Sequence, residues 1–371
     1  MPAELYLAST PLHILNSVAI ASTRDADAHL LLIDQPDVEN NHYFRILSSW
    51  PDSPFKSRFI FPGRIKGHRA KLRSRRETFA RIDEIIRNLN PDVIYTGNDR
   101  RIEFQYAMHS QQRQNKRVAK GVYMDEGTFT YVGRKDSASF SDQYVDNWLK
   151  KLTYGFWWKN PLTIGGSEWI SEVYAAFPEL VHPLLKAKQV SALQPMYQNN
   201  AVVKSFCEQL VSYFSASASD IASLDCVLTL PHESIIERIA GYQAAMLQLV
   251  ETLQKAGLKT GVKYHPRNTN PDILNAASIP GFSLLPYQVP FEALLPLLAD
   301  DVLVIGDVSS TLINGRWLKP NARLLSVANP EVPLYNEFCT LFKQLGVDIS
   351  DSQDVAQALA ALMQKTGEGN A

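Results

Sequence analysis

The stretch VAKGVYMDEG, residues 118–127, decides the fold because it joins a short apolar run to a polar turn that contains glycine. Runs of the same type precede it, and amphipathic stretches such as ETFARIDEIIRNLN lie between them. In this half of the chain the runs are LYLAS at 5–9, HLLLI at 29–33, SRFIFP at 57–62 and DVIYTGN at 92–98. The alternation of buried-type strands and helices predicts a parallel sheet with helices on both faces.

A second series of strand-type runs follows an irregular region that begins past residue 130. These runs are DCVLTLPH at 225–232, KTGVKYHP at 259–266, FSLLP at 282–286, DVLVIGD at 301–307 and NARLLSV at 321–327. A long amphipathic helix is expected near 233–256. Because 371 residues exceed the size at which one hydrophobic core usually stops growing, we expect two domains. The predicted fold is α/β, with two Rossmann-like doubly wound domains.

The boundary between the domains is expected in the polar stretch SALQPMYQNN, residues 191–200. It separates an N-terminal domain over 1–190 from a C-terminal domain over 201–345. A C-terminal helix and tail are expected over 346–371.

Composition excludes several classes of protein. The formal net charge of −1 lacks the basic excess that nucleic-acid-binding domains carry. Cys207, Cys226 and Cys339 have no CxxC spacing, which predicts neither a disulfide framework nor a zinc site. The N-terminus lacks a basic region, and no run reaches the roughly 18 apolar residues of a membrane span. We therefore expect a cytoplasmic protein, with any membrane contact made at the membrane surface.

Loops after the strands are the places to look for function, because ligands of open parallel sheets bind beyond the carboxyl ends of the strands. Asp125, Glu126 and Gly127 directly follow the strand VYM. Two adjacent carboxylates, with a glycine that permits a sharp turn, suit a general base. They fit a helix N-cap with solvated acids equally well, so both interpretations stay open.

His265 ends a strand of the second domain and is followed by Pro266, which fixes the backbone after it. A histidine held there, with Lys263 and Arg267 nearby in the sequence, suits a leaving phosphate that gains negative charge. A structural histidine is the alternative, since His182-Pro183 shows that the pair also occurs elsewhere in the chain.

The segment from Gly306 to Leu312, GDVSSTL, follows the apolar strand VLVI. The hydroxyl groups of Ser309, Ser310 and Thr311, together with free amides at a helix start, predict an anion site. The alternative is a serine N-cap, which explains one serine more readily than a Ser-Ser-Thr run.

The loop after the first strand contains Thr10, Pro11 and His13 but lacks a GxGxxG fingerprint. The chain also has no Walker motif, so hydride transfer and P-loop chemistry are disfavoured. His232-Glu233 is a weaker candidate, either facing a nucleotide base or starting a capped helix.

Taken in order, these motifs resemble those of the bacterial polysialyltransferase and lipooligosaccharide sialyltransferase families. The series is Asp125-Glu126-Gly127, His265-Pro266, Pro290-Phe291-Glu292 and Gly306-x-x-Ser309-Ser310, and the opening Ala8-Ser9-Thr10-Pro11-Leu12-His13 is also similar. Each motif is short, so the specificity lies in their order and spacing over residues 5 to 327.

The resemblance implies the two-domain GT-B architecture and an inverting transfer of sialic acid from CMP-sialic acid, without a metal or other cofactor. The implied acceptor is a glycan of a bacterial surface polysaccharide or lipooligosaccharide. The implied reaction site is the cleft between the N-terminal, acceptor-side domain and the C-terminal, nucleotide-sugar-binding domain.

The resemblance also implies roles for single residues. Asp125 would be the base for the acceptor hydroxyl, and His265 would assist departure of the CMP phosphate. Ser309 and Ser310 would hold that phosphate. The remaining candidates are Glu126 as a catalytic or loop-shaping acid, Pro266, Lys263, Glu292, Gly306 and Thr311 on the nucleotide side, and Gly127, Thr10, Pro11 and His13 on the acceptor side or in structural roles.

Other functions remain open from the residues alone. One is a GT-B transferase with a UDP-hexose donor, and another is a non-catalytic sugar-binding or capsule-assembly protein. A basic stretch over 56–76 suits an anionic membrane, a polyanionic glycan acceptor or a solvated helix face. Its members are Lys56, Arg58, Arg64, Lys66, Arg69, Lys71, Arg73, Arg75 and Arg76.

Overall fold

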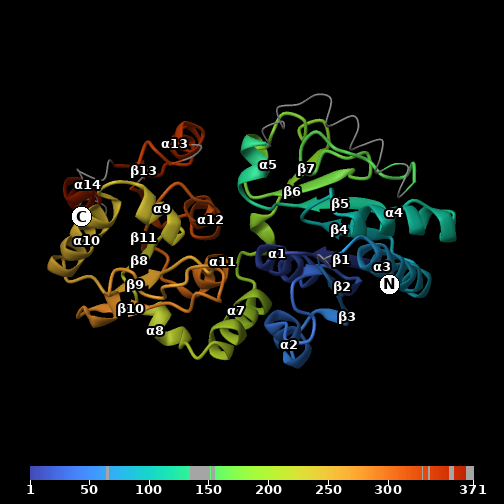
Figure 1. The fold of residues 1–371 in the computed structure, drawn as a ribbon, viewed down its shortest axis with the longest axis horizontal. Coiled ribbons are helices and arrows are strands. Elements are labelled where there is room, and N and C mark those ends of the chain that lie inside the picture. Colours follow the sequence, from blue (N-terminus) through green and yellow to red (C-terminus); the bar gives the residue numbers. More distant parts are fainter. Residues whose placement is uncertain are drawn as a thin grey trace. The chain divides into compact units, whose positions relative to one another are not determined.

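The computed structural model describes residues 1–63, 67–133, 151, 155–327, 329–332, 335–350 and 355–364. The chain divides into two compact units, Met1–Phe206 and Cys207–Ala371 (Figure 1). We describe each unit by itself.

The first unit contains a parallel sheet with the strand order β3-β2-β1-β4-β5-β6-β7. The described strands are β1 (Ala3–Ala8), β2 (Asp27–Gln35), β3 (Phe55–Pro62), β4 (Val93–Thr96), β5 (Lys120–Met124), β6 (Glu172–Ala175) and β7 (Gln189–Ala192). The described helices are α1 (Pro11–Ala21), α2 (His42–Ser49), α3 (His68–Leu89), α4 (Ile102–Asn115), α5 (Thr128–Val132) and the 3₁₀ turns η1 (Pro178–Leu180) and η2 (Gln194–Met196). Helix α7 (Ala201–Tyr213) crosses the division between the units.

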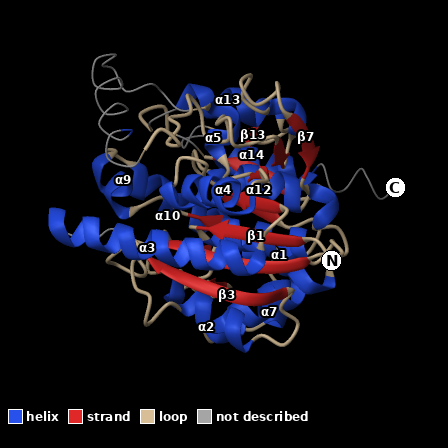
Figure 2. Ribbon diagram, turned by 90° about the vertical axis from the view of Figure 1, so that its right-hand side faces the viewer, coloured by secondary structure: helices blue, strands red, loops and turns tan. Residues whose placement is uncertain are grey.

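Apolar side chains cover both faces of this sheet, as expected for parallel strands with helices on either side. Leu5, Leu7 and Leu30 are fully buried. Helix α3 lies against β3, where the Arg81 guanidinium carbon is 4.5 Å from the centre of the Phe61 ring (Figure 2). The predicted strands of the first half are all present.

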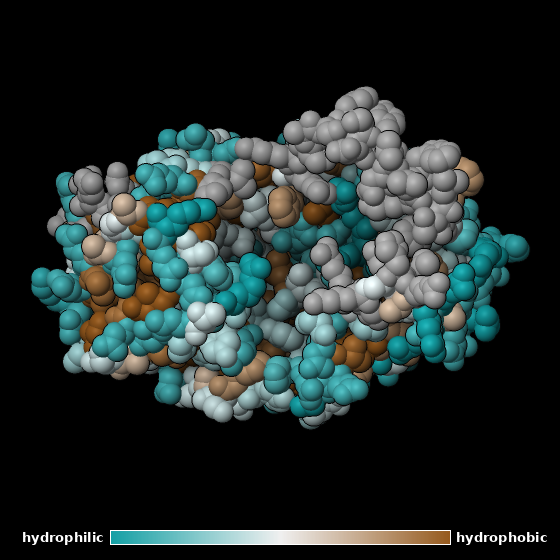
Figure 3. All heavy atoms as spheres, viewed as in Figure 1, coloured by the Kyte–Doolittle hydropathy of each residue, from teal (hydrophilic) through white to brown (hydrophobic). Residues whose placement is uncertain are grey.

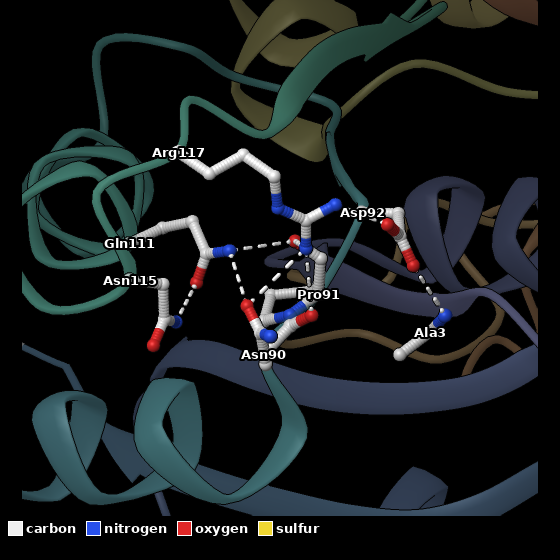
Figure 4. A network of polar contacts seen from close by, with 7 residues as sticks. All are labelled: Ala3, Asn90, Pro91, Asp92, Gln111, Asn115 and Arg117. Atoms are coloured by element: carbon white, nitrogen blue, oxygen red, sulfur yellow. Dashed lines mark hydrogen bonds and ion pairs between the residues drawn. The ribbon is translucent and has the colours of Figure 1, made fainter.

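A polar network fixes the amino ends of β1 and β4 (Figure 4). Asp92 accepts a hydrogen bond of 3.0 Å from the backbone of Ala3, and Arg117 pairs with the same carboxylate. The residues of this network are Ala3, Asn90, Pro91, Asp92, Gln111, Asn115 and Arg117. This edge of the sheet is therefore fixed by the chain's own groups, and the candidate residues follow the opposite, carboxyl ends of the strands.

Two strands of this sheet escape sequence-based prediction. Strand β6 has only four residues, and β7, QVSA, has no apolar run and no buried residue. Within the segment 191–200, Ser191 and Ala192 belong to β7, and η2 follows. A short, solvated edge strand has no hydrophobic pattern by which to recognise it.

The second unit contains another parallel sheet, with the order β10-β9-β8-β11-β12-β13. The described strands are β8 (Cys226–Thr229), β9 (Thr260–Lys263), β10 (Phe282–Leu284), β11 (Leu303–Gly306), β12 (Arg323–Ser326) and β13 (Asp348–Ile349). The described helices are α8 (Ala218–Ala222), α9 (Glu233–Arg238), α10 (Tyr242–Lys255), α11 (Phe291–Leu294), α12 (Ser310–Leu318), α13 (Tyr335–Gln344), α14 (Val355–Gln364) and the 3₁₀ turns η3 (Ala276–Ser278) and η4 (Leu295–Leu297). The predicted α/β class with two Rossmann-like sheets is confirmed.

One expectation for this unit is wrong, and one segment contains an additional strand. The long helix expected near 233–256 is two helices, α9 and α10, separated at Gly241, whose φ of 76° is a left-handed conformation that interrupts a helix. The segment 346–371, expected as helix and tail, also supplies strand β13. Its two residues are too few to leave a periodic signal.

Among the described residues, no helix is long and apolar enough to cross a membrane. The face drawn in Figure 3 is mainly hydrophilic, with separate hydrophobic patches. Arg64 and Lys66 of the basic stretch lie outside the described residues, and so do the side chains of Arg69 and Lys71. Lys56, Arg73 and Arg75 pair with Asp27, Glu77 and Glu103, respectively.

Candidate active site

In the first unit the candidate residues share one edge of the sheet. Strands β2, β1, β4 and β5 are neighbours and run parallel, so the loops after them lie side by side. This edge carries Asp34 at the end of β2, His13 in the first turn of α1, and Arg101 and the Asp125-Glu126 pair in the loops after β4 and β5.

Asp125 is buried, with 3% of its surface exposed, and its carboxylate accepts four hydrogen bonds. Oδ1 accepts from the Gly127 backbone at 2.8 Å and from the Thr130 hydroxyl at 2.7 Å. Oδ2 accepts from the Ala176 backbone at 2.9 Å and from the Tyr131 hydroxyl. Burial raises the pKa of Asp125, and these hydrogen bonds act in the opposite direction. Since a carboxylate offers about four acceptor sites, Asp125 is saturated, and it ties the loop after β5 to the end of β6.

Glu126, in contrast to Asp125, has a carboxylate oxygen that accepts no hydrogen bond from the described part of the chain. Its Oε1 atom is buried and has no hydrogen-bond partner among the described residues. Burial, followed by the nearby negative charges of Asp125 and Asp99, raises the pKa of Glu126 to about 8, and the charge of Arg101 acts in the opposite direction. A carboxyl group with unused acceptor capacity and a pKa near neutrality is suited to receive a proton.

Gly127 makes this arrangement possible. Its φ of 96° lies in the region that side chains with a Cβ rarely adopt. The turn at Gly127 starts helix α5, which returns Thr130 and Tyr131 to the Asp125 carboxylate.

Three further charged residues at this edge were missed by sequence reasoning. Asp99 is fully buried and accepts hydrogen bonds from the backbones of Gly165 at 2.9 Å and Ser167 at 2.7 Å. Arg101 forms an ion pair with Asp34, which follows the apolar part of β2 and has a φ of 57°. For Asp99 and Arg101, the signal available in the sequence was the polar run Asn98-Asp99-Arg100-Arg101 after DVIYTG.

The loop after β1 serves mainly to start helix α1. Thr10 is the N-cap, whose hydroxyl accepts from the His13 backbone at 3.3 Å, and Pro11 is the first helical residue. His13 is buried against Gly97, where an added Cβ would lie 2.2 Å from the imidazole ring. Burial, and then the charge of Arg101, lower the pKa of His13 to about 3, so the ring is neutral at pH 7.

In the second unit, β9, β8 and β11 are neighbours and run parallel, so His265, His232 and Ser309 follow adjacent strands at one edge. The Arg267 backbone donates to Nδ1 of His265 at 3.2 Å, which places the ring proton of neutral His265 on Nε2. Burial lowers the pKa of His265 to about 4, with further contributions from Arg267, His232 and Lys263.

The loop that contains His265 is held by His232 and Glu233. The two histidine rings meet edge to face, with 5.2 Å between their centres. The Glu233 carboxylate accepts from Thr269 and from the Asn270 backbone at 2.7 to 3.1 Å. His232 is the N-cap of α9, so this pair has a structural role in the loop.

Ser309 is the N-cap of helix α12, and its hydroxyl accepts from the Thr311 backbone at 3.1 Å. The Thr311 hydroxyl lies 2.5 Å from Ser309 Oγ and 3.2 Å from Thr229 Oγ1. At Gly306 a Cβ would lie 2.6 Å from Thr229 Oγ1, so only glycine fits beside this hydroxyl cluster. Ser310 is the first helical residue. Hydroxyl groups at a helix N-terminus suit a phosphate.

Lys263 and Glu292 connect loops within the second unit. Lys263 is buried, and its ammonium group donates to the carbonyls of Tyr264 at 3.4 Å and Tyr287 at 3.1 Å. Burial lowers the pKa of Lys263 to about 8, and Glu292 acts in the opposite direction. Glu292 accepts from Asn314 of α12 at 2.5 Å. These contacts tie the end of β9, directly before His265, to the segment after β10 that contains Tyr287.

No group of three or more His, Cys, Asp or Glu side chains suited to a metal ion occurs within the described part of the chain.

The sequence pattern of the Alpha-2,8-polysialyltransferase (POLYST) family matches residues 4–328. No curated protein sequence matches the chain. The match to the family pattern extends over the strands of both sheets from β1 to β12 and over every candidate loop described above.

Solved structures with the same fold include two sialyltransferases. An α/β-galactoside α-2,3-sialyltransferase from Photobacterium phosphoreum has a TM-score of 0.60 at 14% identity, covering 95% of this chain and 99% of its own. A 2,6-sialyltransferase from a Vibrionaceae Photobacterium species, solved with CMP and lactose, has a TM-score of 0.56 at 14% identity, covering 94% and 78%. UDP-GlcNAc 2-epimerase from Methanocaldococcus jannaschii has a TM-score of 0.56 at 11% identity, covering 97% and 92%. At these identities the likeness shows the GT-B-like fold alone.

Proposed function

The chain belongs to the alpha-2,8-polysialyltransferase family, whose members transfer sialic acid from CMP-sialic acid, and we propose that it performs this transfer with inversion onto a hydroxyl group of a glycan acceptor. The acceptor belongs to a bacterial surface polysaccharide or lipooligosaccharide. The observation that carries the proposal is the family match over residues 4–328, which contains all the loops described above.

The first unit supplies the base. Glu126 accepts the proton of the attacking hydroxyl, because it has a partner-free oxygen and a pKa of about 8. Asp125 is a positioning residue, because its four hydrogen bonds hold the backbone that presents Glu126. This proposal differs from the role that the motif alone implies, in which Asp125 is the base.

The second unit supplies the groups for the leaving phosphate. As the bond from the acceptor oxygen to the sugar carbon forms, the bond from that carbon to the phosphate oxygen breaks and CMP departs. His265 donates its Nε2 proton to the phosphate in a hydrogen bond that strengthens as negative charge develops. Ser310 and the N-terminus of α12, capped by Ser309, bind the same phosphate.

We propose that these groups neutralise the leaving phosphate without a metal ion and that the protein acts at the cytoplasmic side of the membrane. Peripheral contact through the basic stretch 56–76 stays a proposal. Three of its residues already have acidic partners, since Lys56 of strand β3 pairs with Asp27, and Arg73 and Arg75 of helix α3 pair with Glu77 and Glu103, so less of its charge is available to a membrane.

Donor binding tests the proposal directly. Isothermal titration with CMP and UDP is expected to give tighter binding of CMP, because the phosphate site consists of one helix N-terminus with its hydroxyl groups. Tighter binding of UDP would favour a transferase with a UDP-hexose donor. A folded protein that binds neither nucleotide would favour a non-catalytic sugar-binding protein.

A further inference from the structure

Arg101 is a cation placed among acidic groups at the carboxyl edge of the first sheet. It precedes helix α4, in the loop after β4, and it reaches across the end of β1 to pair with Asp34 at the end of β2. The loop after β5, which carries Glu126, lies next to it on the other side. Arg101 therefore stands between the strand ends that carry Asp34 and Glu126.

The guanidinium of Arg101 has bonding capacity that the protein does not use. Its Nη1 atom pairs with Asp34, whereas its Nε atom is buried and has no partner among the described residues. About a third of the side chain, 35%, is exposed. A buried donor without an acceptor is costly, and the Nε edge of a guanidinium is shaped for a planar carboxylate.

The surrounding charges make a cation necessary for any acidic ligand here. Glu126 interacts with the negative charges of Asp125 and Asp99, and Arg101 is the positive charge that opposes them. A carboxylate brought next to Glu126 would be repelled by these acids unless a guanidinium compensated it.

We propose that Arg101 selects an acceptor whose terminal sugar carries a carboxylate, by pairing with that carboxylate beside Glu126. The inference rests on the function proposed above, in which Glu126 takes the proton of the acceptor hydroxyl. A terminal sialic acid has the required chemistry, because it presents both a carboxylate and a free side-chain hydroxyl. Asp34 holds Arg101 in place and competes with the acceptor for its charge.

The experiment compares two acceptors at saturating CMP-sialic acid. One is a short oligosialic acid, and the other is the same oligomer with its carboxylates reduced to primary alcohols. The wild-type protein is expected to show a KM about tenfold or more lower for the acidic acceptor, because hydrogen bonds to charged groups have that effect.

Two substitutions of Arg101 test the residue itself. Arg101→Gln is expected to raise the KM for the acidic acceptor to that for the reduced one, and to leave the KM values for the reduced acceptor and for CMP-sialic acid unchanged. Arg101→Lys keeps the charge without the planar edge, so its KM for the acidic acceptor is expected to lie between those of wild type and Arg101→Gln.

Asp34→Asn gives a result that a purely structural ion pair does not predict. Asparagine tolerates the φ of 57° at this position, and its amide no longer competes for Arg101. The KM for the acidic acceptor is therefore expected to fall, at an unchanged KM for the reduced acceptor. If the pair only stabilised the fold, Asp34→Asn would lower the melting temperature and leave both KM values unchanged.

Four other outcomes would overturn the inference. Equal KM values of the wild type for the two acceptors, or an equal rise for both in Arg101→Gln, would remove carboxylate selection. A rise confined to CMP-sialic acid would assign Arg101 to the donor's carboxylate instead. Absence of any transfer by the wild type would contradict the proposed function, and this inference with it.

Discussion

Asp125 and Glu126 show how neighbouring acids take different roles. The Asp125 carboxylate is saturated by Gly127, Thr130, Tyr131 and Ala176, whereas Glu126 Oε1 has no partner among the described residues. The sequence predicts the pair and its glycine. It does not separate their roles, because Ala176 donates from the end of a different strand, far along the chain.

Glu126→Gln is expected to lower turnover by at least about a hundredfold, because the amide cannot accept the proton. Its melting temperature near pH 7 and its CMP affinity should not decrease. Asp125→Asn should instead lose about 1–3 kcal/mol of stability, since its NH₂ group would face donors that the carboxylate satisfied. Transfer, CMP affinity and melting temperature are measured on the same preparations. A stable Asp125→Asn without transfer, beside a fully active Glu126→Gln, would return the role of base to Asp125.

The raised pKa of Glu126 predicts two effects of pH. Turnover should increase as the pH rises through about 8, because the base must be ionised. The folded state binds this proton more tightly than the unfolded state, whose pKa is near 4.5. The stability that this proton contributes is therefore full below about pH 4.5 and lost as the pH rises toward 8.

Glu126→Gln removes this loss of stability. The melting temperature of Glu126→Gln relative to that of wild type should therefore increase as the pH rises from about 4.5 to about 8. Parallel melting curves for the two proteins across this range would contradict the raised pKa.

His265→Ala is expected to lower turnover about a hundredfold or more and to retain CMP binding, because the histidine acts on charge that develops in the transition state. The chain supplies a matched control in His182, which also precedes a proline and whose Nδ1 accepts from the backbone two residues on, at 3.3 Å. His182→Ala should keep normal transfer. Similar activities for the two variants would remove His265 from the reaction.

At the scale of elements, the two serines at the start of helix α12 have different predicted roles, one in capping the helix and one in binding the phosphate. Ser309 is the N-cap, so Ser309→Ala should lower stability by about 0.5–2 kcal/mol in addition to weakening CMP binding. Ser310 caps nothing, so Ser310→Ala should weaken CMP binding at an unchanged melting temperature. Cytidine, which lacks the phosphate, is the control ligand. Equal losses of affinity for CMP and cytidine would indicate damage to the fold instead.

The helices and strands also show where the apolar pattern of the sequence predicts an element and where it does not. Apolar runs predicted β1 and β11, which are buried along nearly their whole length. Strand β7 was missed because its partly exposed residues leave no apolar pattern. The break between α9 and α10 was missed because it lies in backbone conformations, extended at Ile239 and left-handed at Gly241, that periodicity does not report. The ion pair of Arg101 with Asp34 depends on the order of strands, which periodicity does not give.

At the scale of the whole molecule, the candidate catalytic residues are distributed over both units. The first unit carries the acid pair and Arg101, and the second carries His265 and the start of α12. The expectation of a reaction site in the cleft between the domains stays a prediction.

The most direct test of the central claim is to incubate the purified protein with CMP-sialic acid and a short oligosialic acid acceptor in the presence of EDTA, and to analyse the product by mass spectrometry and NMR. The account predicts an acceptor extended by sialic acid, released CMP and an inverted anomeric configuration at the new linkage. A product that retains the donor's configuration, or an acceptor that stays unextended by the folded, CMP-binding protein, would contradict it.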